Sequence, residues 1–479
     1  MMAKKLTIIQ QNDTHGNFEE HNELFWNSNY HLRRVGGFSR IFQFVKELKR
    51  NQNVLFLDGG DLFHGTAPLV LSRGEAVLPL LQEMQIDAFV PGNWDYAYEP
   101  DQLVKLVKQL PFPAVACNVH IKETRVTSLF EPYIVKEVND VTVGVIGTTY
   151  PYVDVTMPEA FSAGLEFSIG VDEVKRCVEA LQKENVDLIV LLSHMGLPLD
   201  YKLASLVSGI HVIVSGHSHD RITKPIIQNE TLIFQSGASG SFLGLLEVTC
   251  EKNRVIDYSH KFIPLDVSQF EDNDKINYLI QQVMEPYSFM KEEIVGKSDT
   301  LLHRMTLNEA PMDKLITNSY LYPFDADFSF SHGWRYGTPV APGNISLYDL
   351  HTIIPTNPEI FSLELTGNEI FQELEKNLEQ VYSTDPFQQK GGYVLRSSGL
   401  FMTYKPYNPK GHRIQYLAIN GEPFNPEKVY RIISAGEQLF KQYSNRKQPK
   451  HVHAIEVIKA YLSEKGPFST GGPPSIISV

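Results

Sequence analysis

Five short polar segments each follow an apolar run, and this arrangement constrains the fold more than any other feature of the chain. The apolar runs have the length of buried strands: Leu6–Ile9, Val54–Leu57, Ala88–Val90, Leu188–Leu192 and His211–Val214. The segments after them are Asp13-Thr14-His15, Gly60-Asp61, Gly92-Asn93, Ser193-His194 and Gly216-His217-Ser218-His219. In open α/β sheets, functional groups gather just outside the carboxyl ends of strands. The chain is therefore predicted to bring carboxylate, imidazole and amide groups together at one sheet edge.

The order of the patterns predicts two domains. Apolar runs alternate with helical patterns to about residue 265, which is typical of helices layered on a sheet. The helices expected there are Phe38–Leu48, Val77–Met84 and Val171–Lys183, and further strands are expected at Leu232–Ser236 and Leu245–Cys250. Because 479 residues exceed what one core usually supports, a second domain is expected. We predict a first domain at 1–265, a linker helix at 266–296 and a second domain at 297–479.

The spacing of apolar residues predicts helices in the linker and at one place in the second domain. In the linker, Asp272–Met284 has helical spacing with mixed charge, and Phe289–Ile294 continues it. In the second domain, a helix is expected after Leu365-Thr366-Gly367.

Composition narrows the class of protein. The formal net charge is −13, so a nucleic-acid polymer is a poor partner, because sequence-independent binding needs a basic surface. No apolar run approaches the length of a transmembrane helix, so no membrane partner is expected. Cys117, Cys177 and Cys250 are far apart and form no CxxC pattern, which disfavours a disulfide framework or a thiolate zinc site. Met1–Lys5 leads directly into the first strand, so we predict a cytoplasmic protein, unless a leader peptide has been removed.

The residue types in the five segments suit transition-metal binding. Asp13 and His15 are one residue apart and can reach the same ion, whereas the Asp61 carboxylate can bridge two ions. An amide oxygen and three imidazoles are added by Asn93, His194, His217 and His219. A mixed nitrogen and oxygen set favours Mn, Zn, Fe or Co over Ca or Mg. Two such cations about 3.5–4 Å apart would deprotonate a bridging water and clamp the oxygens of an in-line displacement.

A lone histidine is more often a surface or hydrogen-bonding residue, and a motif such as Asp58–Asp61 is usually a turn, so only the ordered set of segments indicates a metal site. Longer motifs accompany it: Asn12-Asp13-Thr14-His15-Gly16, Gly60-Asp61-Leu62-Phe63-His64-Gly65, Gly36-Gly37-Phe38-Ser39-Arg40, Ala116-Cys117-Asn118-Val119 and Gln235-Ser236-Gly237. Together these segments resemble the calcineurin-like metallophosphoesterases, and more narrowly the 5′-nucleotidase family. The resemblance implies a four-layer α/β/β/α sandwich followed by a smaller α/β C-terminal domain of 5′-nucleotidase type, which would recognise the substrate and rotate against the first domain.

The same resemblance implies two divalent metal ions and assigns their ligands. One ion would be held by Asp13, His15, Asp61 and His219. The other would be held by Asp61, Asn93, His194 and His217. Asp61 and Asn93 would thereby be catalytic as well as metal-binding residues.

The second domain offers two candidates for substrate binding. Arg335 ends the segment Phe330-Ser331-His332-Gly333-Trp334-Arg335, which lies where the family has a segment ending in arginine, and it could grip a phosphate or carboxylate. An ordinary salt bridge is an equally good reading of Arg335. Tyr393 lies near the position of an aromatic that stacks on the nucleobase, although plain packing is at least as good a reading.

One segment departs from the family pattern. The family follows its metal-binding Asn with a catalytic His, supported by an Asp three residues on, but here Trp94 and Ala97 occupy those positions. Such a His is worth roughly 10²–10⁴-fold in rate, whereas tryptophan has one N–H donor and no exchangeable charge. Either the enzyme is slow, or its leaving group needs no proton, or another residue compensates. By motif context the nearest candidates for compensation are His64 and His332.

Three functions stay open. The leading prediction is a cytoplasmic two-metal phosphoesterase whose partner is a small phosphorylated substrate, expected to be a nucleotide. The second is a hydrolase of a non-phosphate (sulfur) ester on the same scaffold, since a thiosulfohydrolase branch of the superfamily looks similar at the Trp94 segment. The third is a metal- and nucleotide-binding protein with little turnover. Retention of all seven candidate ligands argues against the third.

Overall fold

The computed structural model describes residues 3–124, 128–471 and 474–479. Contacts divide the chain into two compact units. The first is Met1–His21 with Arg33–Pro286, and the second is Asn22–Leu32 with Tyr287–Val479. The start of the chain at Met1 and Met2, on which the cytoplasmic prediction partly depends, lies outside the described residues.

Three of the five candidate segments follow strands of the first sheet of the first unit. Its order is β15-β14-β1-β4-β5. The strands are β1 (Lys4–Gln11), β4 (Val54–Asp58), β5 (Ala88–Phe89), β14 (Phe242–Cys250) and β15 (Val255–Pro264). β1, β4 and β5 are parallel, whereas β14 is antiparallel to both β1 and β15. The segments of Asp13, Asp61 and Asn93 therefore leave the same edge of this sheet.

The second sheet precedes the other two segments. Its order is β12-β13-β11-β10-β8-β7. The strands are β7 (Tyr133–Val138), β8 (Val141–Thr148), β10 (Leu188–Ser193), β11 (Val212–Ser215), β12 (Ile226–Gln228) and β13 (Thr231–Phe234). The four central strands are parallel, and β7 and β12 pair antiparallel at the edges. The segments of His194 and His217 consequently leave neighbouring strands at one edge.

Alternate side chains of both sheets form one apolar core. Leu55 and Leu57 of β4 belong to the same buried cluster as Val190 and Leu192 of β10. Burying an aliphatic side chain contributes about 1.5–3 kcal/mol, and a one-residue slip would turn every such side chain to the wrong face. The core therefore fixes the register of the strands and with it the position of the loops that follow them.

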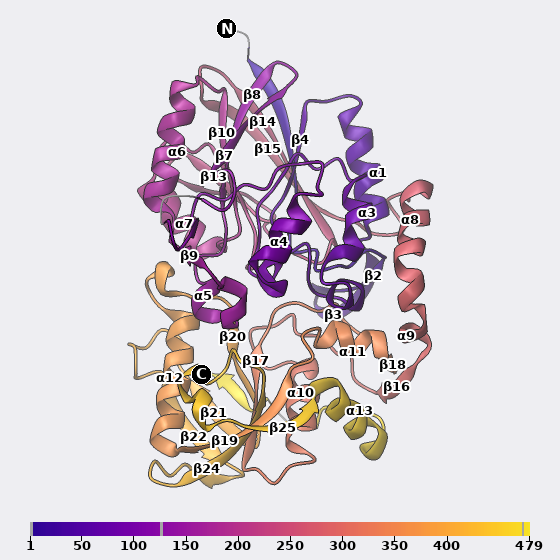
Figure 1. Cartoon of the computed structure of the whole chain (residues 1–479), viewed down its shortest axis with the longest axis vertical. Helices are drawn as coiled ribbons and strands as arrows, with labels where there is room; N and C mark the ends of the chain where they lie inside the picture. The colour runs from indigo at the N-terminus through magenta and orange to yellow at the C-terminus, as the bar shows by residue number, and fades with distance from the viewer. Residues whose placement is uncertain (1–2, 125–127, 472–473) are drawn as a thin grey trace. The chain divides into compact units, whose positions relative to one another are not determined.

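Helices cover the outer faces of the two sheets (Figure 1). Contacts join α1 to β4, α6 to β8, α7 to β11, and α8 to α1. These helices are α1 (Phe38–Lys49), α6 (Val171–Lys183), α7 (Leu197–Leu206) and α8 (Asp274–Met284). The layers are helix, sheet, sheet and helix, which confirms the four-layer sandwich.

Short elements connect the layers. They are α2 (Ala67–Leu71), η1 (Glu75–Val77), α3 (Leu78–Leu81), η2 (Asp95–Tyr98), α4 (Pro100–Val107), β6 (Val119–Ile121), α5 (Val153–Thr156), η3 (Glu159–Ser162) and β9 (Leu165–Phe167). The single helix expected at Val77–Met84 is wrong, because a 3₁₀ turn ends at Val77 and α3 stops at Leu81. Pro79 lacks a backbone N–H and therefore suits the start of a new helical turn better than the interior of a longer helix.

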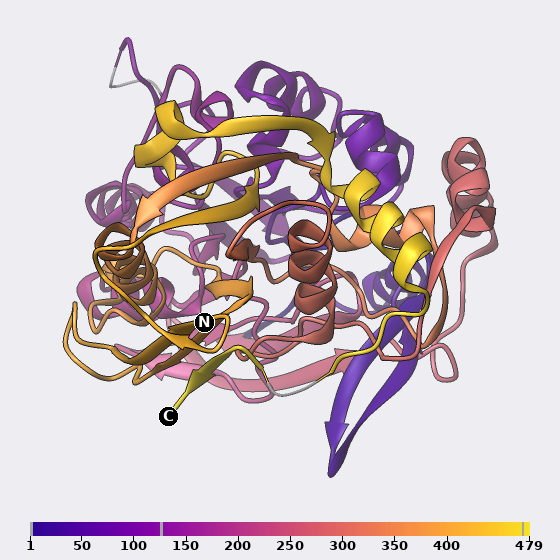
Figure 2. The ribbon, with the colours of Figure 1, turned by 90° about the horizontal axis from the view of Figure 1, so that it is seen from below.

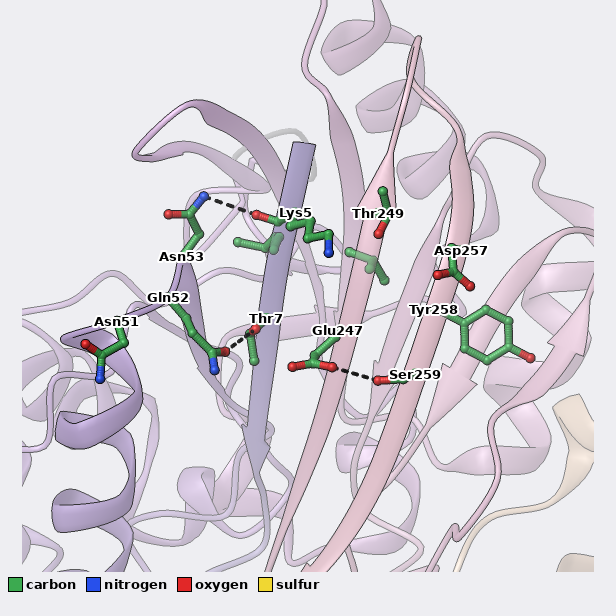
Figure 3. Close-up of a pocket in the computed structure, with 12 residues that line it drawn as sticks. Lys5, Thr7, Asn51, Gln52, Asn53, Glu247, Thr249, Asp257, Tyr258 and Ser259 are labelled. Carbon is green, nitrogen blue, oxygen red and sulfur yellow. Dashed lines mark hydrogen bonds between the residues drawn. The ribbon is translucent and has the colours of Figure 1, made fainter. Parts of the chain in front are cut away.

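A pocket of about 440 Å³ opens on the outward face of β1, β14 and β15 (Figure 3). Polar side chains line it, and hydrogen bonds join Thr7 to Gln52 (2.9 Å) and Ser259 to Glu247 (2.8 Å). Lys5 and Thr7 belong to the amino-terminal half of β1. The pocket therefore lies at the opposite end of this sheet from the loop that carries Asp13.

The second unit is built on a sheet of order β20-β17-β24-β19-β25. Its strands are β17 (Phe328–Gly333), β19 (Glu359–Thr366), β20 (Tyr393–Ser398), β24 (Val429–Ala435) and β25 (Gln448–His453). A four-stranded sheet contains β21 (Leu400–Tyr404), β22 (Ile414–Ile419), β23 (Glu422–Pro423) and β26 (Ile476–Ser478), and a two-stranded sheet pairs β16 (Ile294–Ser298) with β18 (Gly343–Ser346). Apolar side chains of the two larger sheets share one buried cluster. This mixed α/β unit is the predicted C-terminal domain.

Helices complete the second unit. They are α9 (Ser288–Glu292), α10 (Pro311–Leu321), α11 (Leu347–Ile353), α12 (Gly367–Tyr382) and α13 (Ala454–Lys465), with 3₁₀ turns at Pro386–Gln388 (η5) and Lys441–Arg446 (η6). Figure 2 shows α13 beside α10, which it contacts. The predicted helix start after Leu365 is confirmed, because the Thr366 hydroxyl accepts from the Glu369 N–H in a capping box.

Residues 266–296 do not form one continuous helix. α8 belongs to the first unit and α9 to the second, and the 3₁₀ turn Glu285–Tyr287 (η4) lies between them. The helical pattern expected to reach Ile294 ends at Glu292, because Ile294 pairs with Ser346 at the start of β16.

A hairpin that the sequence did not predict is formed by β2 (His21–Asn27) and β3 (Asn29–Val35). Its residues Asn22–Leu32 group with the second unit. Within that unit the Tyr30 ring meets His303 edge to face, with centroids 5.8 Å apart. In the described part of the chain, every helix is too short or too polar to cross a membrane.

Candidate metal centre

All seven predicted metal ligands converge in the first unit. Two groups of three residues each have all their ligand atoms within 4.8 Å of one another, namely Asp13, His15 and His219, and Asp13, Asp61 and His194. The Asp61 Oδ2 atom lies 3.6 Å from His15 Nε2 and 3.4 Å from His194 Nε2, so it faces imidazoles of both groups. A carboxylate oxygen placed between two imidazoles in this way is compatible with the bridging role expected for Asp61.

Asn93 and His217 complete the cluster. The Asn93 side-chain oxygen lies 2.8 Å from His217 Nδ1 and 3.3 Å from His194 Nε2. Its amide nitrogen points the other way and donates to the Met157 sulfur at 3.7 Å. The thioether is a weak acceptor and cannot donate, so this contact favours the orientation in which the amide oxygen faces the imidazoles.

Backbone carbonyls orient two of the imidazoles. His15 Nδ1 lies 3.0 Å from the His64 carbonyl oxygen, and His194 Nδ1 lies 2.5 Å from the Gly59 carbonyl oxygen. A carbonyl only accepts, so each Nδ1 carries a proton, and Nε2 is the ring nitrogen that could bind an ion once it is deprotonated. Such a contact fixes the tautomer and the ring orientation of a metal-binding histidine.

Five of the seven candidate ligands have left-handed backbone conformations, although none is glycine. Their φ angles are 50° for Asp13, 48° for His15, 57° for Asp61, 69° for His217 and 60° for His219. This region costs a non-glycine residue of order 1–3 kcal/mol and is concentrated at functional sites. The strain at these loops therefore points to a role other than stability.

The buried aspartates and histidines of the cluster carry opposite charges and shift one another's pKa values. Burial favours a higher pKa for Asp13, but the His219 and His194 imidazoles bring that pKa below its ordinary value. Burial favours a lower pKa for His194, but Asp61 and Asp13 raise it to about 10. A divalent cation can supply the positive charge that these carboxylates demand. The donor set of imidazole, carboxylate and amide groups fits first-row divalent ions.

Asp95 organises the loops of two ligands and was missed from the sequence. Its carboxylate accepts four backbone N–H groups at 2.7–2.9 Å, from Asp61, Leu62, Phe63 and Gly92. Gly92 is required there, since a Cβ on it would lie 2.1 Å from Asp61 Oδ1. Burial raises the pKa of Asp95 to about 7, and the neighbouring Asp61 adds to this effect. Its place directly after Trp94 was the only available signal.

Trp94 holds the Asp61 carboxylate through its backbone. Its N–H donates to Asp61 Oδ1 at 2.8 Å. The indole is buried, with 6% exposure, and it stacks on the His64 ring at a centroid distance of 4.6 Å and an angle of 14°. Burial, with His15 nearby, lowers the pKa of His64 to about 3, so this imidazole is neutral at pH 7. Ala97 donates its N–H to the Trp94 carbonyl.

The three candidates of the second domain lie in the second unit. His332 is on β17, and burial together with Arg335 and Arg396 lowers its pKa to about 4. Tyr393 begins β20, and the Arg396 guanidinium lies 5.4 Å from the centroid of its ring. Arg396 was not singled out from the sequence. It is buried and pairs through Nε with Asp313 Oδ2 at 3.1 Å, a partner 83 residues away in the chain.

Two family models match the chain. The calcineurin-like phosphoesterase model matches residues 6–221, and the 5′-nucleotidase C-terminal domain model matches residues 294–436. Human 5′-nucleotidase is 24% identical over 485 residues, which cover 90% of this chain and 82% of that protein.

Two solved structures from Thermus thermophilus have a similar fold. A 5′-nucleotidase precursor gives a TM-score of 0.88 at 24% identity and covers 99% of each chain. The sulfate thiohydrolase SoxB in complex with glycerol gives 0.91 at 24% identity and covers 99% of this chain and 96% of that one. The matched models and the fold agree on both halves of the molecule. Residues 6–221 are thus of the calcineurin-like phosphoesterase family and residues 294–436 of the 5′-nucleotidase C-terminal domain family, and the human relative that the chain matches over both is named a 5′-nucleotidase.

Proposed function

We propose that the chain is a two-metal phosphoesterase acting on nucleotides or related small phosphate esters. The convergence of the seven predicted ligands around Asp61 Oδ2 is the observation that supports it best. One ion would be held by Asp13, His15, Asp61 and His219, and the other by Asp61, Asn93, His194 and His217. Two divalent ions at such a centre supply an acidified water and stabilise charge on the oxygens of the displacement.

The residues around the proposed centre bear on the choice of substrate. Trp94 stands where the family has an acid, and His64, its stacking partner, is neutral at pH 7. The centre then favours leaving groups that depart without a proton, such as the phosphate of an anhydride or an aryl oxide. We also propose that Arg335 grips the anionic part of the substrate, with Tyr393 as a candidate for contact with the base.

A second candidate function follows from the same observation. A sulfur leaving group is a weaker base than an alkoxide and needs no general acid. A sulfur ester is therefore the alternative substrate for a centre that has Trp94 in place of the histidine. SoxB, the sulfate thiohydrolase whose fold this chain shares, is the relative that suggests this chemistry.

A panel assay separates these functions. The metal-stripped chain is supplied with Mn²⁺ and tested on nucleoside mono- and diphosphates, dinucleotides, sugar phosphates, aryl phosphate and thiosulfate esters. Phosphate release from a nucleotide supports the first proposal, and preferential turnover of a sulfur ester supports the second. Tight nucleotide binding without turnover contradicts both and favours a binding protein.

A cytoplasmic location is part of the proposal. All three cysteines are buried free thiols: Cys117, Cys177 and Cys250. Free thiols are typical of proteins in reducing compartments such as the cytoplasm. Fractionation of the source cells tests the location, and recovery of the chain outside the cytoplasm would contradict it.

A further inference from the structure

Two of the candidate imidazoles follow serines that end neighbouring strands. Ser193 is the last residue of β10 and directly precedes His194. Ser215 is the last residue of β11, two residues before His217. β10 and β11 are parallel and pair Ser193 with Ser215. Contacts that fix these two serines therefore also fix the backbone from which the two histidine side chains extend.

Asp200 lies against the first of these serines. It belongs to α7, and its side chain is completely buried. The Ser193 hydroxyl donates to its Oδ1 at 2.6 Å. Burial raises the pKa of Asp200 to about 7, while the hydroxyls of Ser193 and Ser215 and the nearby His194 act to lower it. Placing a carboxyl here is costly, because a buried charge without a full set of partners is destabilising.

Other buried polar groups hold the same turns. The Ser193 oxygen accepts the Met195 N–H at 3.2 Å, which fixes the chain just after His194. On the other strand, Gln235 Nε2 donates to Ser215 Oγ at 2.9 Å and to the Gly216 carbonyl at 2.6 Å. The network therefore clamps the backbone on either side of His194 and just ahead of His217.

We propose that Asp200 is a positioning residue for His194, which it fixes by holding Ser193 at the end of β10. The inference rests on the proposed function, since it assigns this imidazole to one of two bound ions. Asp13 and His15, which would hold the other ion, belong to the loop after β1, whereas the hydrogen bond of Asp200 is to the strand end that precedes His194. Loss of the Asp200 carboxyl should therefore weaken one ion more than the other.

The test is metal titration of the full-length chain. The stripped protein is titrated with Mn²⁺ by calorimetry, and electron paramagnetic resonance reports whether two ions are spin-coupled. Wild type should bind two coupled ions. Asp200→Ala should weaken the second ion by about 10–100-fold, the usual cost of losing an outer partner of a metal ligand, and excess Mn²⁺ should restore activity. Asp200→Asn, which keeps an acceptor for Ser193, should stay within a few-fold of wild type.

Asp87 provides a matched control in the same unit. It is a buried carboxyl that pairs with Lys49 and Lys136 and accepts the Phe56 N–H, and it directly precedes the amino end of β5. Asp87→Ala should lower Tm and leave both Mn²⁺ affinities unchanged. If Asp200→Ala does not fold, Ser193→Ala removes the same hydrogen bond and should show the same selective loss.

Two outcomes would overturn the inference. Equal weakening of both ions, with a Tm loss like that of Asp87→Ala, would make Asp200 merely structural. Unchanged affinities in Asp200→Ala would remove it from the centre. A wild-type chain that binds no Mn²⁺ would contradict the proposed function and the inference with it. If wild type binds two ions, a failure in the Asp200 variants contradicts the inference alone.

Discussion

At the residue scale, Asp61 is the side chain that both halves of the proposed centre share. Its Oδ2 faces His15 and His194, while its Oδ1 is held by the Trp94 N–H. Asp61→Ala should therefore remove both ions and abolish hydrolysis, whereas His217→Ala should lose mainly one ion. Elemental analysis of the purified variants measures this directly. Unchanged metal content in Asp61→Ala would defeat the two-metal assignment.

Trp94 should determine which leaving groups are accepted. If the missing imidazole limits turnover, kcat/KM should be much higher for an aryl phosphate than for a nucleoside monophosphate, because only the nucleoside leaving group needs a proton. The double variant Trp94→His with Ala97→Asp should narrow that margin in kcat/KM. Trp94→His alone should do less, since the new ring lacks an orienting carboxylate.

A control separates the chemistry of Trp94 from its packing on His64. Trp94→Phe keeps a stacked ring and the backbone N–H to Asp61, so it should leave the preference for aryl esters unchanged. No gain in the double variant, together with loss of activity in His64→Ala or His332→Ala, would assign the proton transfer to those histidines.

At the element scale, the 3₁₀ turn η2 holds the loops after β4 and β5 together through Asp95. In the wild type, the two carboxylate oxygens of Asp95 accept four backbone N–H groups. Asp95→Asn replaces one of these oxygens by an N–H₂ group, which cannot accept, so the backbone donors that faced it lose their partner. Each buried donor left without a partner costs about 1–3 kcal/mol, so the free energy of unfolding should fall by at least that amount. Chemical denaturation measures the change. Asp101→Asn, at an exposed position in the first turn of α4, is the matched control and should be close to neutral.

An Asp95 variant as stable as wild type would show that these loops do not depend on the carboxylate. Weaker Mn²⁺ binding should accompany the loss of stability, because the same hydrogen bonds fix the chain at Asp61 and Gly92.

The sequence predicted the strands and the ligand loops because their signal is local. The five apolar runs became β1, β4, β5, β10 and β11, and α6 has the expected bounds. Asp95 and Asp200 escaped notice because their roles depend on hydrogen bonds to distant or backbone groups, which residue types do not encode. The helix expected to reach Ile294 failed for a similar reason, since pairing with β18 overrides the local helical pattern.

At the scale of the whole molecule, the proposed metal ligands and the proposed substrate residues belong to different units. Arg335→Ala should therefore keep both ions but weaken binding of an anionic substrate by about 1.5–3 kcal/mol, as expected for a charge-assisted hydrogen bond. Steady-state kinetics and elemental analysis test both halves of this prediction. Arg431→Ala, an exposed arginine of the same unit paired with Asp325, should change neither quantity. Unchanged constants in Arg335→Ala would remove it from the substrate site.

The central claim is that two divalent ions are needed for hydrolysis of a small phosphate ester. The most direct measurement is phosphate release from the best substrate as stripped protein is titrated with Mn²⁺. We expect no activity without metal and full activity only once two ions are bound per chain, at the affinities found by calorimetry. Full activity without metal, or with one bound ion, would contradict it.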